Sequence, residues 1–127
     1  MPKTPKQILK MEPGLNLDSL ITSEIFGLVI CGTTKDPLDG KECLLSVGEN
    51  APCILPRYST SIEGAFEVRE WVIDNIGGVK IENVCDELPE YCDIWNGKEY
   101  IKAQGKTAAE AICKAALIAV IKGGAKF

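Results

Sequence analysis

The residues with the clearest chemical potential in this sequence of 127 residues lie in the stretch PRYSTSIEGAFEV, which runs from Pro56 to Val68. An arginine, a tyrosine and three consecutive hydroxyl side chains lead there directly into a helical pattern. The N-terminus of a helix offers unpaired N–H groups and a partial positive charge, which together can hold a phosphate or a carboxylate. A lysine and a threonine introduce a second helical pattern near the C-terminus. If the fold brings the two helix starts to one edge of a sheet, we expect an anion-binding site formed by Arg57, Tyr58, Ser59, Thr60, Lys106 and Thr107.

In that site Tyr58 would be available to stack on a nucleobase. The same residues also have a purely structural interpretation. Thr60 and Thr107 each precede a glutamate by three residues, which is the spacing of a capping box, and such boxes occur at helix starts that bind nothing. In this alternative Tyr58 is a core aromatic and Arg57 is solvated.

Six cysteines and the lack of histidine limit the other chemistry of the chain. No pair of cysteines has the C-x-x-C spacing typical of zinc sites. A zinc site assembled from distant loops is nevertheless an alternative, and its candidate ligands are Cys31, Cys43, Cys53, Cys85 and Cys92. Cys113 has the place of a small core residue in an apolar helical pattern. We predict no metal ion and no other cofactor.

A catalytic role has little support in the sequence. A serine or cysteine nucleophile would lack its usual histidine base, and there is no glycine-framed serine or P-loop. The acidic pairs Asp86 with Glu87 and Glu90 with Asp93 could act as acid and base or bind a divalent cation, but a solvated acidic loop is the simpler interpretation. We therefore predict that the protein is not an enzyme and assign no catalytic residue.

Length and charge restrict the class of protein further. The chain is long enough for one domain, and its net charge of −4 disfavours binding to a nucleic-acid polymer. No segment has the apolar length of a membrane span or of a signal peptide, so we expect a soluble intracellular protein with reduced cysteines. Residues 1–15 contain three prolines and three lysines and are predicted to form an N-terminal arm before a single domain at 16–127.

The spacing of apolar and turn residues predicts an α+β fold. An antiparallel sheet should have helices packed on its faces, as in an α-β-α sandwich. The apolar stripe of the middle helix is predicted to contain Ile62, Ala65, Phe66, Val72, Ile73 and Ile76. The predicted elements are a helix over 17–28, an irregular hairpin within 29–57, a helix from Thr60 to Gly77-Gly78, a strand over 79–84, a hairpin around Asn96-Gly97, and a helix from Thr107 to Gly123-Gly124.

Two features favour contacts with other molecules. The apolar arc of the last helix is too wide for a single stripe, which predicts burial on two sides, either within the fold or against another subunit. Trp71 lies off the main stripe of the middle helix, and Trp95 stands beside the Asn96-Gly97 turn. These aromatics are either covered by the chain itself or form a subunit interface.

Three segments, LDSLITSEIFG, PRYSTSIEGAFEV and TAAEAICKAAL, resemble the phage ABA (α-β-α) sandwich domain family of small phage and prophage proteins. The resemblance spans about Asn16 to Ile121. The family commonly has Trp at the position of Phe66 and Arg at that of Lys114. It implies a phage origin and a layered fold, and it supplies no established activity.

The residues and the resemblance together predict a non-catalytic phage accessory protein that acts in the host cytoplasm. We expect it to self-associate as a homo-oligomer and to bind a small anionic, nucleotide-like ligand, which would allow it to sequester a host signalling nucleotide. The alternative is a protein–protein interaction module that docks on a host or virion protein, with the Ser/Thr cluster serving only the structure.

Overall fold

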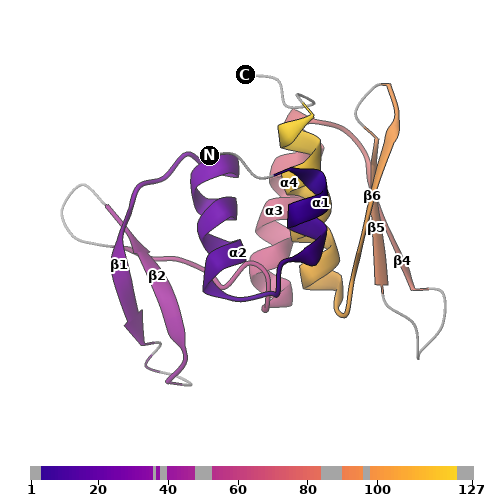
Figure 1. Ribbon diagram of the computed structural model, residues 1–127. Helices are drawn as coiled ribbons and strands as arrows, with labels where there is room; N and C mark the ends of the chain where they lie inside the picture. Colours follow the sequence, from indigo (N-terminus) through magenta and orange to yellow (C-terminus); the bar gives the residue numbers. More distant parts are fainter. Residues whose placement is uncertain are drawn as a thin grey trace.

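A computed structural model of the chain describes residues 4–35, 37, 40–47, 53–83, 90–95 and 98–122. Helices and two small antiparallel sheets alternate along these residues, which confirms the predicted α+β class. In Figure 1 the helices lie between the two sheets, one on each side. No helix within the described ranges is long and apolar enough to cross a membrane.

The elements follow one another largely in the predicted order. The three-stranded meander β4-β5-β6 is confirmed, although Asn96 and Gly97 of its expected turn lie outside the described residues. In place of one irregular hairpin there is a second sheet with the strand order β1-β2-β3. The elements are α1 (Pro5–Lys10), α2 (Leu15–Leu20), the π-helical stretch η1 (Ile21–Ile25), β1 (Ile30–Lys35), β2 (Glu42–Ser46), β3 (Cys53–Ile54), α3 (Ile62–Asn75), β4 (Val79–Asn83), β5 (Glu90–Trp95), β6 (Tyr100–Gly105) and α4 (Ala108–Ile121).

Helix α4 is the centre of the fold. Every residue from Ala109 to Ala119 is buried, because α1, α3, η1 and the strands β5 and β6 all contact this helix. Its wide apolar arc is therefore covered by its own chain. The arc no longer supports an interface with another subunit.

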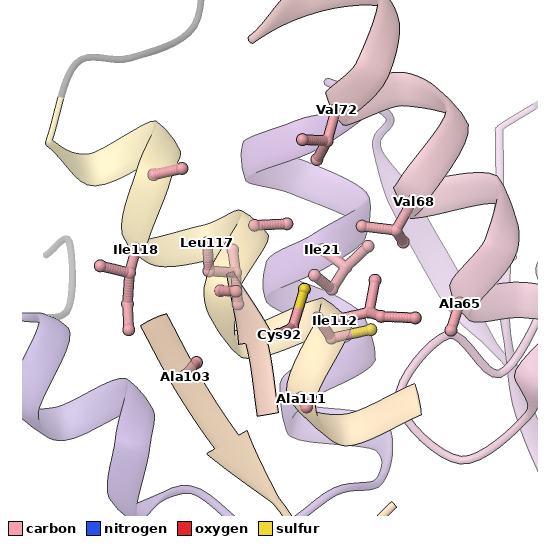
Figure 2. Close-up of a cluster of buried hydrophobic side chains, with 14 of the residues drawn as sticks. Ile21, Ala65, Val68, Val72, Cys92, Ala103, Ala111, Ile112, Leu117 and Ile118 are labelled. Carbon is pink, nitrogen blue, oxygen red and sulfur yellow. The ribbon is translucent and has the colours of Figure 1, made fainter. Parts of the chain in front are cut away.

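The β4-β5-β6 sheet turns one face toward α4. In β6 the exposed and buried residues alternate, as expected for a strand with one covered face. Gly105 ends this strand where a Cβ atom would come within 2.8 Å of the Ala111 nitrogen, so the lack of a side chain permits the close approach to α4. Figure 2 shows the core side chains that meet there, among them Val68, Val72, Cys92, Ala103, Ile112 and Leu117.

The predicted apolar stripe of α3 is wrong by part of a turn. Ala65 and Val72 are buried as expected, together with Gly64 and Val68. By contrast, three residues predicted to be buried are exposed, namely Ile62, Phe66 and Ile73. Trp71, predicted to lie off the stripe, is half-buried against the core. The helix is rotated because it packs mainly on α4, a contact that the periodicity of one helix cannot specify.

The expected N-terminal arm is in part a helix of the domain. Thr4 and Gln7 form a capping box at the start of α1, and Ile8 is fully buried. The ammonium of Lys114 on α4 donates a hydrogen bond of 3.1 Å to the carbonyl oxygen of Leu9. Residues 5–10 escaped the sequence prediction because so short a helix shows hardly more than one turn of periodicity.

Candidate functional site

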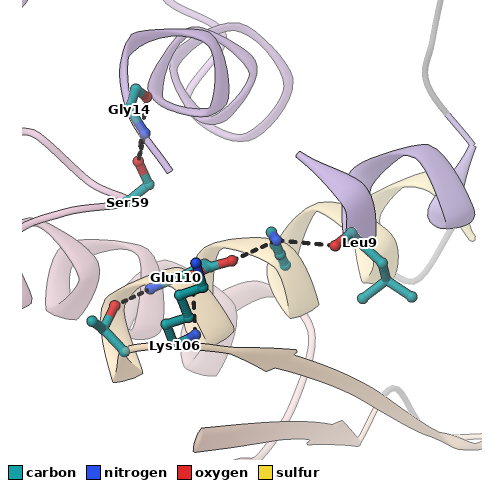
Figure 3. Close-up of polar contacts among 7 residues, drawn as sticks. Leu9, Gly14, Ser59, Lys106 and Glu110 are labelled. Carbon is teal, nitrogen blue, oxygen red and sulfur yellow. Dashed lines mark hydrogen bonds and ion pairs between the residues drawn. The ribbon is translucent and has the colours of Figure 1, made fainter. Parts of the chain in front are cut away.

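The turn that leads into α3 is closed to solvent at its centre. Ser59 is fully buried, and its N–H and its hydroxyl group both donate to Oδ1 of Asp18, at 2.7 and 2.6 Å. The Ser59 hydroxyl also accepts a hydrogen bond of 2.9 Å from the N–H of Gly14 (Figure 3). The N–H and the hydroxyl of Ser59 are therefore engaged within the protein, and this residue of the predicted site is closed to solvent.

Asp18 is the residue of this region that sequence reasoning missed. It lies in the first turn of α2 and is only 2% exposed. Burial raises the pKa of its carboxyl group above the ordinary value, against the lowering effect of the Ser59 hydrogen bonds and of the Arg57 charge. A carboxylate of the protein itself thus occupies the place where an external anion was expected.

Tyr58 is a core aromatic, as the structural alternative proposed. It is 4% exposed, and its ring stacks on Phe26 with a distance of 5.2 Å between the ring centroids. Burial, together with the nearby carboxyl groups of Glu67 and Asp18, raises the pKa of its hydroxyl group to about 12. Because the ring is already packed on Phe26, it is not available to stack on a nucleobase.

The start of α3 also uses a carboxylate of the chain. The N-cap is Ser61, whose hydroxyl accepts from the Gly64 N–H, so the predicted cap Thr60 is wrong by one residue. The Ser61 hydroxyl donates to Glu63 over 2.9 Å, and hydrogen bonds from the Glu63 backbone and from Ser61 lower the pKa of that carboxyl group. Thr60 itself is exposed in the preceding turn.

The start of α4 is capped as predicted, with one difference in the capping box. The Thr107 hydroxyl accepts a hydrogen bond of 3.2 Å from the N–H of Glu110. Glu110 reaches back to the N–H of Lys106, at 3.0 Å, while its other oxygen lies 2.6 Å from the ammonium of Lys114. Figure 3 shows these contacts as a group separate from that of Ser59. Glu110 and Lys114 are both buried, so this is an internal ion pair.

The two helix starts share one end of the molecule without forming the predicted site. Helices α3 and α4 pack together, and Figure 1 shows both beginning at the lower end. Thr60, Lys106 and Thr107 are exposed there, whereas Tyr58 and Ser59 are sealed. At each helix start, carboxyl groups of the chain itself accept hydrogen bonds from nearby N–H or O–H groups. The six predicted residues do not line one open surface.

An open groove lies beside this region, and one predicted site residue belongs to it. The groove has a volume of about 390 Å³ and runs between the β2-β3 strands and the first turns of α3. Arg57, half-buried, is one of its lining residues, and neither Lys106 nor Thr107 is among the described lining residues. Apolar, acidic and basic groups therefore meet in one cavity, which is lined by Cys43, Ile54, Leu55, Pro56, Arg57, Ser61, Glu63, Gly64 and Glu67.

The described cysteines do not converge on a metal site. Cys31, Cys43 and Cys53 belong to the β1-β2-β3 sheet, whereas Cys92 lies in the core beneath α4. Within the described ranges no three residues of the types Cys, Asp, Glu and His are placed to hold a metal ion. Cys85, Asp86 and Glu87 fall outside those ranges.

The buried thiols are poor nucleophiles. Burial raises the pKa of Cys92 to about 12 and that of Cys113 well above its ordinary value. Cys113 is fully buried on α4 and has the structural place that the sequence predicted.

Comparison with known proteins identifies the family. The profile of the phage ABA sandwich domain matches residues 20–117, and the chain therefore belongs to that family. A crystal structure of a phage protein from Bacillus cereus ATCC 14579 is similar in fold, with a TM-score of 0.63. The two chains share 24% sequence identity, and the match covers 85% of this chain and 91% of the other. Comparison with curated proteins gives no significant match.

Proposed function

We propose that this phage ABA sandwich domain protein is a non-catalytic binding protein that holds a small, anionic, nucleotide-like ligand in the groove beside α3. The observation that carries this proposal is the composition of the groove around Arg57. Its volume of about 390 Å³ lies within the roughly 300–1,000 Å³ range of small-molecule sites. The proposed site keeps Arg57 from the sequence prediction and replaces the other five residues.

The mixed lining suits a nucleotide better than a bare anion. The guanidinium of Arg57 can pair with a phosphate group through two hydrogen bonds. The carboxylates of Glu63 and Glu67 can accept hydrogen bonds from ribose hydroxyls or from an amino group. Ile54 and Leu55 offer an apolar wall for a base. Binding without turnover would let the protein sequester a host signalling nucleotide in the host cytoplasm.

Two features support a role without catalysis. The chain contains no histidine, and the thiols of Cys92 and Cys113 are protonated and buried. Self-association is part of the same proposal. Since α4 is covered by its own chain, the surface for self-association has to be sought elsewhere.

Thermal unfolding in the presence of linear and cyclic nucleotides tests the ligand. A ligand at one hundred times its Kd adds about 2.7 kcal/mol to the free energy of unfolding, so the melting temperature should rise with nucleotide concentration. Arg57→Ala should abolish the rise, whereas Lys106→Ala, which removes an exposed charge outside the groove, should preserve it. A melting temperature that no nucleotide changes would contradict the proposal.

A second candidate function is favoured by the exposed apolar side of α3. Ile62, Phe66 and Ile73 are 39%, 46% and 41% exposed and lie four and seven residues apart on one side of the helix. Such a stripe suits docking on a host or virion protein. Phe66→Ser should then prevent capture of that protein at an unchanged melting temperature. Capture that survives this substitution would argue against the stripe as the docking surface.

A further inference from the structure

The outer face of the β4-β5-β6 sheet, on the side away from α4, is not covered by any described element (Figure 1). Successive side chains of β5 and β6 point to opposite faces of the sheet, so every second residue of these two adjacent strands lies on the outer face. Trp95 and Tyr100 are exposed on this face, by 40% and 70%. The outward residues of these two strands are Tyr91, Asp93, Trp95, Tyr100, Lys102 and Gln104.

The register of the sheet places these side chains in three level pairs. Tyr91 lies opposite Gln104, Asp93 opposite Lys102, and Trp95 opposite Tyr100. The rings of Trp95 and Tyr100 are 4.9 Å apart, and the Lys102 ammonium lies 5.2 Å from the centre of the Tyr91 ring. One end of these paired residues is therefore aromatic, with Trp95 and Tyr100. Asp93 and Lys102 form a charged centre, and the other end has the aromatic ring of Tyr91.

Asp93 is the unusual member of this face. Its side chain is only 14% exposed, and its Oδ1 atom is buried and accepts no hydrogen bond from a described residue. The Lys102 ammonium stands 3.8 Å away, which is an ion pair but too long for a hydrogen bond. Buried polar atoms generally have a hydrogen-bond partner, so an oxygen with none among the described residues is unusual.

A two-fold axis parallel to the strands and running between β5 and β6 would give each of these six residues of β5 and β6 a partner in the second copy. Such an axis places the outward residues of β5 in one copy over those of β6 in the other. Because the pairs are level, Asp93 then faces the second copy's lysine, and Trp95 faces its tyrosine. An isologous interface requires this kind of self-complementary surface, with opposite charges in contact.

We propose that the outer face of β4-β5-β6 is the surface through which two copies of this chain associate, with Asp93 and Lys102 pairing across the interface. The inference rests on the self-association part of the proposed function and is independent of the groove. The second copy's lysine places a further positive charge beside the Asp93 carboxyl group. The two Trp95–Tyr100 pairs form one four-ring cluster that removes their exposed surface from water.

Sedimentation velocity without nucleotide tests the association. From micromolar to millimolar concentration the mass should rise from the 13.8 kDa of one chain toward twice that value. Tyr100→Arg should weaken the dimer about tenfold, since it removes aromatic contacts and adds a charge at the centre of the cluster. Phe66→Arg, a matched change of an exposed aromatic on α3, should leave the dimer intact. A chain that stays monomeric to millimolar concentration, or a dimer that only Phe66→Arg weakens, would overturn the proposal.

A charge exchange distinguishes contacts between copies from those within one copy. Lys102→Glu and Asp93→Lys should each be monomeric alone, because each places like charges opposite one another. Mixed in equal amounts they should form a heterodimer, in which both charge pairs are opposite again. A mixture that stays monomeric while the unchanged protein dimerises would overturn the assignment. Nucleotide binding is measured separately through Arg57→Ala, so that either proposal can fail alone.

Discussion

Two buried carboxyl groups, Asp18 and Glu110, occupy corresponding places near the starts of α3 and α4, but they are stabilised differently. Glu110 is paired with the ammonium of Lys114 and with a backbone N–H. Asp18 is held by the neutral N–H and O–H groups of Ser59, and burial raises its pKa. One region contains a buried ion pair, and in the other a buried carboxyl group accepts from neutral donors and is affected by the Arg57 charge. The two regions should therefore respond differently to substitution.

The largest effect is expected from Lys114→Met. The substitution leaves Glu110 buried without its cation and removes the bond to Leu9 that fastens α1, so the free energy of unfolding should fall by about 3–5 kcal/mol. Lys122→Met is the matched control, because its ion pair with Glu99 is exposed and worth about 0–1 kcal/mol. Urea unfolding measures both. Equal losses of unfolding free energy in the two variants would show that the buried ion pair contributes no more to stability than the exposed one.

Ser59→Ala should have the next largest effect. It removes the hydroxyl that donates to Asp18 at 2.6 Å and leaves a buried oxygen with one donor fewer, at a cost of about 1–3 kcal/mol. Ser23→Ala, which removes the exposed hydroxyl bonded to the Ser19 carbonyl, should change the stability much less. An equally small change for Ser59→Ala would mean that the contact with Asp18 contributes little to stability.

The pH dependence of stability should report on Asp18. The pKa of Asp18 is raised in the folded protein, so between the unfolded pKa of about 3.9 and the folded pKa the folded state keeps a proton that the unfolded state has lost. Its contribution to stability is thus present at low pH and is lost as the pH rises through this window. In Asp18→Asn the amide oxygen can still accept from Ser59, and this decline should be absent. Denaturation at a series of pH values compares the two proteins, and parallel curves would contradict the assignment.

The smallest effect concerns the caps of the two helices. Ser61→Ala should cost about 1 kcal/mol because Ser61 is the N-cap of α3, and Thr107→Ala should cost a similar amount at α4. Thr60→Ala should be close to neutral because Thr60 is exposed and is not the cap. Thermal unfolding of the three variants shows which residue is the N-cap of α3. A loss for Thr60→Ala in place of Ser61→Ala would restore the prediction made from sequence.

The candidate site illustrates how far the residues alone could lead. The capping box at Thr107 was predictable, because cap and partner stand within one helical turn. The sealing of Ser59 was not predictable, since its partner Asp18 lies 41 residues away and belongs to another helix. Arg57 belongs to a groove only because the chain after β3 passes beside the first turns of α3. The i, i+4 spacing of Glu63 and Glu67 was the one local signal for this groove.

By itself the sequence determined the types and order of most elements, the three-strand meander and the central place of apolar residues in the last helix. These features depend on contacts between residues that are close in the sequence or on the alternation of apolar and polar residues. The periodicity of the sequence shows both. Only the tertiary structure decided which side of α3 is buried, that α1 joins the domain through a contact between Lys114 and Leu9 over 105 residues, and which carboxyl groups occupy the helix starts. Such contacts join distant segments, and their free energy depends on how complete elements pack.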